Sequence, residues 1–176
     1  MIHIAITTIH GIIEALLDNR AAPLTCENFV RYCTAGAYVD GTFWRTVTTY
    51  PDNQPQQSVK IDVIQATSRA DCSKFPPIAM EQTHTTGLRH RDGTLSMARF
   101  APDSAQADFF VCIGDQPELD AGGARNADGW GFAAFGQVIC GMDVVRRIHT
   151  APAEGQSLTP PIAIHGVMVL SRTEHC

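Results

Sequence analysis

The chain carries its clearest fold signal in GTLSMAR, residues 93–99, together with FWR at 43–45 and DFFVC at 108–112. All three segments are mostly apolar and suited to β-strands, and FWR ends on Arg45. No single segment is specific for a fold, but their order along the chain is. Together they predict three strands that wall one cleft.

The N-terminal residues predict a β-hairpin. Ile2, Ile4 and Ile6 alternate with other side chains, and this period of two is typical of a strand. Gly11 predicts the turn, and residues 12–17 predict the returning strand.

Two helices are predicted. The first has Thr25 as its N-cap, an apolar stripe with helical spacing from Cys26 to Cys33, and a left-handed stop at Gly36. The second covers 142–148, with its valines and isoleucine facing inward.

The remaining apolar stretches predict short strands around 43–47, 59–66, 94–100, 108–113, 132–138 and 162–169, the last with a slip at His165-Gly166. Many short strands with two helices indicate a mainly β fold, a closed antiparallel β-barrel capped by two α-helices. The length of 176 residues is enough to bury about two-thirds of the unfolded surface. A single domain over 1–176 is therefore expected.

Composition excludes several classes of function. The net charge of −5 does not provide the basic field that nucleic acid binding needs. No apolar run is long enough for a transmembrane helix, and the first residues lack the pattern of a signal peptide. A cytoplasmic location is expected, or a periplasmic one if a leader was removed.

The six cysteines do not form a C-x-x-C pair, so a zinc or redox motif is not indicated. Cys26 and Cys33 lie two helical turns apart, about 10 Å, which is too far for a disulfide. We expect reduced, buried thiols. The spacing of His84 and His90 fits no zinc motif, and Ser96 lacks the context of a nucleophile, so a structural role is expected for it.

A further segment, FGQV at 135–138 followed by GMDVV at 141–145, completes the pattern. The ordered set resembles the cyclophilin family of peptidyl-prolyl cis/trans isomerases, whose usual segments are close to FHR, GTLSMA and a pair of phenylalanines. The resemblance covers nearly the whole chain. It implies an enzyme that isomerises X–Pro bonds of unfolded or extended polypeptides and assists protein folding. No cofactor or metal is implied, and a monomer is expected.

The resemblance also assigns site residues. The family's cleft arginine, glutamine and deep phenylalanine fall on Arg45, Gln65 and Phe110, with Arg45 catalytic. The predicted substrate-binding residues are Val63, Gln65, Ala98, Arg99, Asp108, Phe110, Leu119 and Phe132. Five of them, Val63, Ala98, Phe110, Leu119 and Phe132, are expected to form an apolar recess for a proline ring.

Strand alternation gives each candidate a face. It places Phe43, Arg45 and Val47 on one face of their strand. It places Ala98 on the face of its strand opposite to Met97 and Arg99. Arg45 is the one cation that the alternation places on the cleft face.

The chain departs from the family's pattern between Arg45 and Gln65, where the interval is longer than usual. An ungapped match would place Tyr50 and Asn53 in the positions of the aromatic residue and the glutamine. We prefer the gapped match, with Asp62 and Gln65, because 59–65 has the pattern of a strand. The extra stretch, 48–58, is expected to be an ordered loop at the cleft rim whose polar residues do not fill a core and which biases peptide entry.

Other departures are Trp44 for a histidine, Arg99 for an asparagine, Asp108 for a glutamine and Glu118 for the tryptophan of cyclosporin-sensitive members. We therefore expect weak cyclosporin binding.

Prolyl isomerisation needs no bond cleavage, only tighter binding of the twisted amide than of the planar one. A guanidinium that donates toward the prolyl nitrogen would favour that state. Two alternatives stay open from sequence: a module that binds proline peptides without catalysis, and a β-barrel that carries a small ligand in its lumen.

Overall fold

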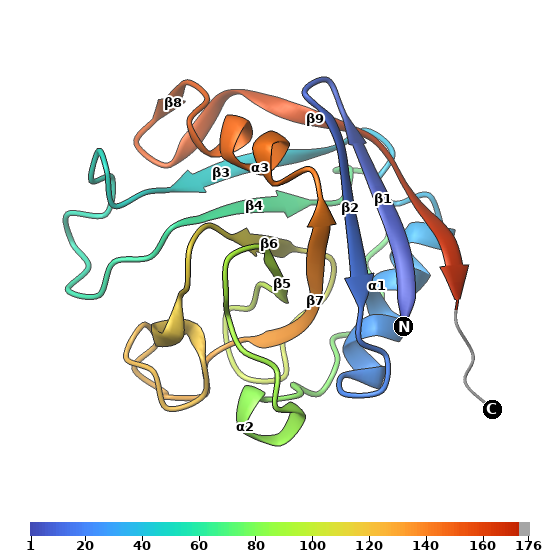
Figure 1. Ribbon diagram of the computed structural model, residues 1–176, viewed down its shortest axis with the longest axis horizontal. Coiled ribbons are helices and arrows are strands. Elements are labelled where there is room, and N and C mark those ends of the chain that lie inside the picture. The colour runs from blue at the N-terminus through green and yellow to red at the C-terminus, as the bar shows by residue number, and fades with distance from the viewer. Residues whose placement is uncertain (173–176) are drawn as a thin grey trace.

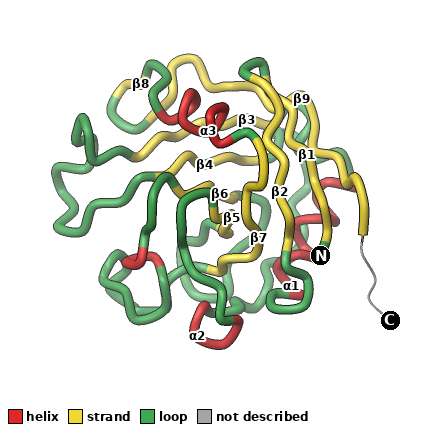
Figure 2. The backbone as a smooth tube through the Cα atoms, in the orientation of Figure 1, coloured by secondary structure: helices red, strands yellow, loops and turns green. Residues whose placement is uncertain are grey.

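The computed structural model describes residues 1–172. Figure 1 follows the chain from end to end, and Figure 2 marks its helices, strands and loops. The strands are β1 (Ile2–Thr8), β2 (Gly11–Leu17), β3 (Gly41–Val47), β4 (Val63–Thr67), β5 (Thr94–Met97), β6 (Phe109–Cys112), β7 (Ala133–Cys140), β8 (Ala153–Glu154) and β9 (Ser157–Arg172). The helices are α1 (Pro23–Thr34), α2 (Thr83–Thr86), α3 (Met142–His149) and the 3-10 helix η1 (Pro117–Leu119).

Eight strands form a closed antiparallel barrel. Their order is β1-β2-β7-β5-β6-β4-β3-β9, and pairing of β1 with β9 closes the ring. The short β8 pairs with β9 in a separate hairpin. The predicted barrel is confirmed, and so is the N-terminal hairpin, in which Thr8 pairs with Gly11 at the turn.

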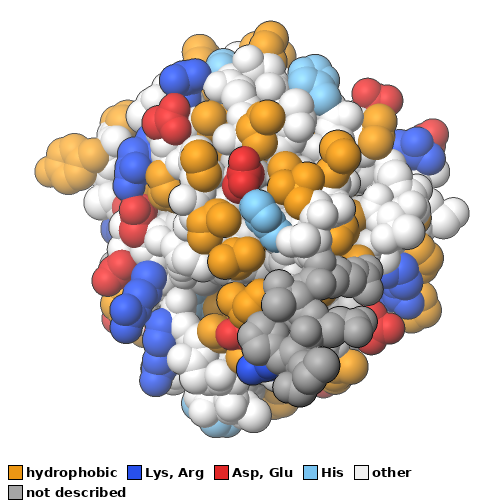
Figure 3. Space-filling view, turned by 45° about the vertical axis from the view of Figure 1, so that its right-hand side comes forward, with side chains coloured by type: hydrophobic (Ala, Val, Ile, Leu, Met, Phe, Trp, Pro, Cys, Tyr) orange, Lys and Arg blue, Asp and Glu red, His pale blue; other side chains and the backbone are white. Residues whose placement is uncertain are grey.

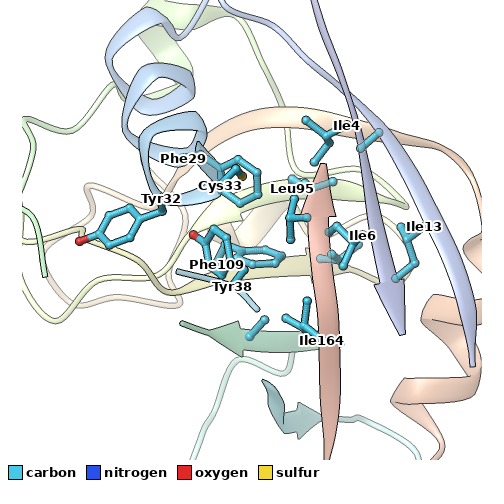
Figure 4. Close-up of a cluster of buried hydrophobic side chains, with 14 of the residues drawn as sticks. Ile4, Ile6, Ile13, Phe29, Tyr32, Cys33, Tyr38, Leu95, Phe109 and Ile164 are labelled. Atoms are coloured by element: carbon cyan, nitrogen blue, oxygen red, sulfur yellow. The ribbon is translucent and has the colours of Figure 1, made fainter. Parts of the chain in front are cut away.

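The barrel interior is filled by side chains, as Figure 4 shows for part of it. Ile4, Ile6 and Ile13 are fully buried. Phe29 of α1 packs against Phe109 with ring centroids 5.2 Å apart in an edge-to-face geometry, a favourable aromatic contact. An interior packed with apolar side chains does not match the open lumen of a barrel that carries a small ligand.

Helix α1 begins differently from the prediction, because Thr25 lies inside the helix and is not its N-cap. Pro23 occupies the first turn, where its fixed φ suits the helix and its missing N–H costs nothing. The carboxylate of Glu81 accepts hydrogen bonds from the backbone N–H groups of Leu24 (3.1 Å) and Thr25 (2.8 Å) and from the Thr25 hydroxyl (2.6 Å). A residue far along the chain therefore caps the helix. The predicted left-handed Gly36 after its end is confirmed, with φ of +64°.

Helix α3 matches the second predicted helix, with Val144, Val145 and Ile148 buried. The single turn of α2 was not predicted. The predicted slip in the last strand is confirmed, because Thr7 pairs with Gly166 and Thr8 with Ile164, which leaves His165 unpaired with β1.

Within residues 1–172, the structure contains no helix that is long and apolar enough to span a membrane. The thiols of Cys26, Cys33, Cys72, Cys112 and Cys140 are free; Cys72 is half-buried and Cys140 exposed, contrary to the expected burial. Cys176 lies outside the described residues.

Candidate active site

Arg45 reaches the cleft because of a β-bulge in β3. Phe43 pairs with Ala66 and Arg45 with Gln65, so Trp44 is an extra residue with no partner on β4. The bulge reverses the alternation: Phe43 points into the barrel core, whereas Arg45 lies on the cleft side. The prediction that Phe43 shares a face with Arg45 and Val47 is therefore wrong for Phe43.

Two neutral amides hold the Arg45 guanidinium. Its Nη1 donates to Gln65 Oε1 at 3.0 Å. Its Nε and Nη2 both donate to Gln156 Oε1, at 2.9 and 2.6 Å. Burial lowers the pKa of Arg45, but an arginine stays protonated. The result is a fixed, partly desolvated cation without an anionic partner within 4.0 Å among residues 1–172.

Gln65 connects Arg45 to the next strand. It lies opposite Phe110 of β6, and its Nε2 donates to Asp108 Oδ2 at 3.5 Å. Asp108 Oδ1 accepts from the Thr67 hydroxyl at 2.6 Å. This chain of contacts orients the Gln65 amide with its oxygen toward Arg45. Gln65, the residue of the gapped match, thus contacts Arg45, whereas Asn53, the residue of the ungapped match, bonds backbone groups.

An apolar recess lies next to Arg45 and is separate from the barrel core. The structure brings together all five residues expected there, in a cluster made of Val47, Ile61, Val63, Phe110, Cys112 and Leu119 with Ala98 and Phe132 packed against it. The rings of Phe110 and Phe132 meet edge to face, with centroids 5.3 Å apart. The recess opens into a cleft of about 510 Å³.

A buried polar relay supports the floor of the recess and was not predicted. The His90 ring stacks on Phe110, with centroids 6.0 Å apart. Its Nδ1 lies 2.7 Å from Asp120 Oδ1, and its Nε2 lies 2.9 Å from Ser96 Oγ. Ser96 is fully buried behind the cleft, in keeping with a structural role.

Arg99 lines the cleft on the same side as Ala98, contrary to the alternation that separated them. Strand β5 ends at Met97, so the strand period no longer applies to these two residues. The Arg99 guanidinium forms a two-pronged ion pair with Asp128, at 2.7 and 2.8 Å, and lies over the Phe132 ring, 5.2 Å from its centroid. Arg99 therefore covers the edge of the recess.

The stretch 48–58 is fixed to the barrel by side-chain hydrogen bonds. Asn53 bonds Thr48 N, Thr46 O and Gly155 O at 2.9–3.1 Å. Gln54 is buried and pairs with the backbone of Ile61, which contradicts the expectation that the polar side chains stay out of the interior. These contacts also hold residues 59–62 outside β4, so the strand is shorter than predicted.

Asp62, which stands where the family has an aromatic residue, points back to the same stretch. Its carboxylate accepts from Thr49 N at 2.8 Å and from the Thr49 hydroxyl at 2.7 Å. Asp62 is thus used to anchor the loop.

Sequence reasoning missed several residues of the cleft. Trp44, Lys74 and Arg125 line the cleft, and Gln156 does not line it but accepts hydrogen bonds from Arg45. Gln156 lies 111 residues from Arg45 in the chain, and no local pattern relates them. Among residues 1–172, no group of three His, Cys, Asp or Glu side chains is placed to hold a metal ion.

Comparison with known proteins agrees with this geometry. The model of the family "Cyclophilin type peptidyl-prolyl cis-trans isomerase/CLD" matches residues 2–169. The chain belongs to this family. The resemblance, the barrel and the prediction of a prolyl isomerase are thereby confirmed.

The similar curated proteins include bacterial isomerases. Peptidyl-prolyl cis-trans isomerase A of Dickeya dadantii (strain 3937) is 32% identical over 97% of this chain and 85% of its own length. Peptidyl-prolyl cis-trans isomerase B of Escherichia coli (strain K12) is 32% identical over 80% of both chains. A solved cyclophilin-type isomerase of Cryptosporidium parvum, crystallised in the presence of the dipeptide Ala-Pro, shares the fold with a TM-score of 0.76. It is 19% identical, and the match covers 97% of this chain and 99% of the other.

Proposed function

We propose that the cleft catalyses cis/trans isomerisation of X–Pro bonds through Arg45 and the neighbouring apolar recess. The observation that carries the proposal is the position of a fixed, unpaired guanidinium beside a recess lined by Val63, Phe110, Leu119 and Phe132. The substrates are unfolded or extended segments that contain proline, and the biological role is assistance in protein folding.

The mechanism follows from amide resonance. Rotation about a planar amide meets a barrier of about 18–20 kcal/mol, because the nitrogen lone pair is delocalised. A proline ring held in the recess fixes one side of the bond. Each Nη nitrogen of Arg45 keeps a second N–H with no hydrogen-bond partner in the described part of the chain. One of these N–H groups donates toward the prolyl nitrogen when it becomes pyramidal, and so stabilises the twisted state.

The remaining predicted residues bind the substrate or orient Arg45. Gln65 and Asp108 form the wall between Arg45 and β6, and Ala98 and Arg99 form the rim along which the residue before proline extends. No cofactor is needed, because the reaction breaks no covalent bond.

The loop 48–58 has a further proposed role as a filter for peptide entry. It follows Arg45 directly, and its residue Gln57 lines the cleft. Shortening it should change the ranking of X–Pro peptides more than the melting temperature. A much lower melting temperature with the same ranking of peptides would show that the loop only stabilises the fold.

For partners and compartment, we propose a monomer that binds cyclosporin weakly and works in a reducing compartment such as the cytoplasm. The buried, unpaired thiols of Cys26, Cys33 and Cys112 support this compartment, and burial raises the pKa of each.

The test is an isomerase assay in which a protease cleaves only the trans form of an X–Pro peptide. Wild-type protein should accelerate the slow phase, whereas Phe110→Ala should lose most of that acceleration because the proline ring loses its floor. Binding of X–Pro peptides without acceleration by a folded wild-type protein would instead make the chain a proline-peptide-binding module.

A further inference from the structure

The cleft is cationic although the protein is acidic. The chain has a net charge of −5, yet the cleft is lined by four cationic side chains and one carboxylate. The cations are Arg45, Lys74, Arg99 and Arg125, and the carboxylate is Asp108. The cleft through which substrate enters is therefore positively charged, although the chain as a whole is negatively charged.

Two of these cations are already compensated. Arg99 is paired with Asp128, and Lys74 donates to the Ser68 hydroxyl at 2.6 Å with Asp108 4.0 Å away. Arg45 and Arg125 differ, because within residues 1–172 neither has a carboxylate within 4.0 Å. Both bond only to neutral oxygens.

Arg125 is held firmly enough to act as a binding group. It extends from the loop after η1, and its Nη1 donates to Gln54 Oε1 at 3.0 Å and to Val59 O at 2.5 Å. Its Nε and Nη2 have no hydrogen-bond partner in the part of the chain that the structure describes, and they remain open to a ligand. A pre-organised guanidinium with free N–H groups matches a carboxylate.

Arg125 also has a defined place along the substrate path. Its partner Val59 precedes β4, whereas Ser68, the partner of Lys74, follows β4. The two cations thus lie at opposite ends of the strand that carries Val63 and Gln65. A peptide seated on this strand with its proline at Val63 passes Arg125 on one side of the proline only.

The two unpaired guanidinium groups also influence each other. Burial, and then the positive charge of Arg45, lower the pKa of Arg125. This repulsion between like charges in a partly buried cleft is relieved when an anion binds there.

We propose that Arg125, with the field of Arg45 behind it, forms a subsite for the carboxylate of an acidic side chain close to the isomerising proline. The enzyme accordingly prefers X–Pro segments that carry Asp or Glu on one side of the proline. This inference rests on the proposed isomerase function and adds a substrate class to it.

The experiment measures kcat/KM by exchange NMR, without a coupling protease whose own specificity would interfere. The peptides have blocked ends and contain one Ala-Pro bond. In separate peptides, Glu, Gln or Lys stands either before this Ala-Pro pair or after it. Glu should exceed Gln about fivefold on one side of the proline, as a part-exposed charge pair allows, and Lys should fall below Gln. The preference should shrink in high salt.

Variants assign the preference to Arg125. Arg125→Gln should abolish the Glu-over-Gln ratio, and Arg125→Glu should reverse it in favour of Lys. Arg20→Gln is the matched control, because Arg20 is exposed and does not line the cleft, and the variant makes the same change in net charge. It should keep the wild-type ratio.

Three outcomes would overturn the subsite: equal rates for Glu, Gln and Lys at every position, a ratio that survives Arg125→Gln, or equal loss of the ratio in Arg20→Gln. A preference that appears only in peptides with a free C-terminus would assign the carboxylate to the chain end and overturn the side-chain assignment. If wild-type protein isomerises no peptide, the proposed function fails. Chemical-shift titration with the Glu and Gln peptides then still decides the subsite.

Discussion

Arg45 is positioned by two neutral amides, Gln65 and Gln156, and this choice of partners suits the catalytic role proposed for it. A carboxylate partner would neutralise the guanidinium that is meant to act on the prolyl amide, whereas an amide oxygen orients it and leaves its charge available. Gln156 is itself oriented, because its Nε2 donates to Asn53 O at 3.0 Å. The loop 48–58 therefore acts on Arg45 through Gln156.

Replacing Gln156 tests this positioning. Gln156→Met keeps the length of the side chain but removes the acceptor for Arg45 Nε and Nη2. We expect kcat to fall roughly tenfold, about 1.4 kcal/mol of transition-state stabilisation, with little change in KM. Steady-state kinetics and a thermal melt measure both properties.

Gln56→Met is the control, because Gln56 is exposed in the same loop and does not line the cleft. A fall in the melting temperature of Gln156→Met with kcat intact would make Gln156 a structural residue only.

The prediction of weak cyclosporin binding rests on Glu118. It stands where sensitive family members have tryptophan, and its Oε2 accepts from Ala124 N at 2.7 Å, so the side chain turns toward its own loop. Loss of a partnered polar contact costs about 1–3 kcal/mol, so binding should be at least ~10-fold weaker than in sensitive members. Calorimetric titration of wild type and Glu118→Trp checks this, and the variant should regain part of the affinity. Tight binding by wild type would refute it.

At the scale of elements, helix α1 depends on a carboxylate from a distant segment. Glu81, 56 residues beyond Thr25, satisfies N–H groups that open the helix. Glu81→Ala should lower the free energy of unfolding by about 1–2 kcal/mol, as loss of an N-cap does, measured by urea denaturation. Glu27→Ala, at an exposed position of the same helix, is the control. Equal small effects of both changes would show that the cap contributes nothing specific.

The elements that sequence predicted well are those with a regular pattern. The hairpin and α3 show clear periods of two and 3.6, and their burial follows that period. Helix α2 has only four residues, too few for any period. The cap of α1 was missed because a contact between distant segments leaves no local signal.

The bulge at Trp44 shows why the face of a strand is harder to predict than the strand. The sequence FWR does not indicate whether Trp44 is an extra residue in the strand. The bulge nevertheless moves Phe43 into the core and leaves Arg45 on the cleft. The resemblance to the family put Arg45 at the cleft, which the structure shows it to line, while alternation alone misplaced Phe43. Gln156 and Arg125 lie on turns and loops, where neither period nor motif identified them.

At the scale of the whole molecule, the outer face of the barrel is the surface to consider for the expectation that the protein is a monomer. Exposed apolar side chains lie on β2, β7 and β9, among them Ile12, Ile139 and Met168. His3 of β1 and Glu14 of β2 lie 2.8 Å apart, and β1 pairs with both β2 and β9. Figure 3 shows an acidic side chain beside a histidine near the middle of this face, with hydrophobic side chains around them. Interface cores are depleted in charged residues, so this face is a poor dimer interface.

Light scattering coupled to size exclusion should therefore give the monomer mass over a wide range of concentration. A dimer that Ile139→Ser or Met168→Ser dissociates would contradict this and would identify the face as an interface.

The central claim is that one guanidinium, fixed beside an apolar recess, carries the isomerisation. Comparison of kcat/KM for wild type, Arg45→Lys and Arg45→Ala tests it most directly. Arg45→Ala should lose at least ~100-fold, about 2.7 kcal/mol of transition-state stabilisation, while circular dichroism shows an intact fold. Arg45→Lys should recover little, because a lysine lacks the planar donors that Gln65 and Gln156 orient. Unchanged turnover by a folded Arg45→Ala protein would contradict the account.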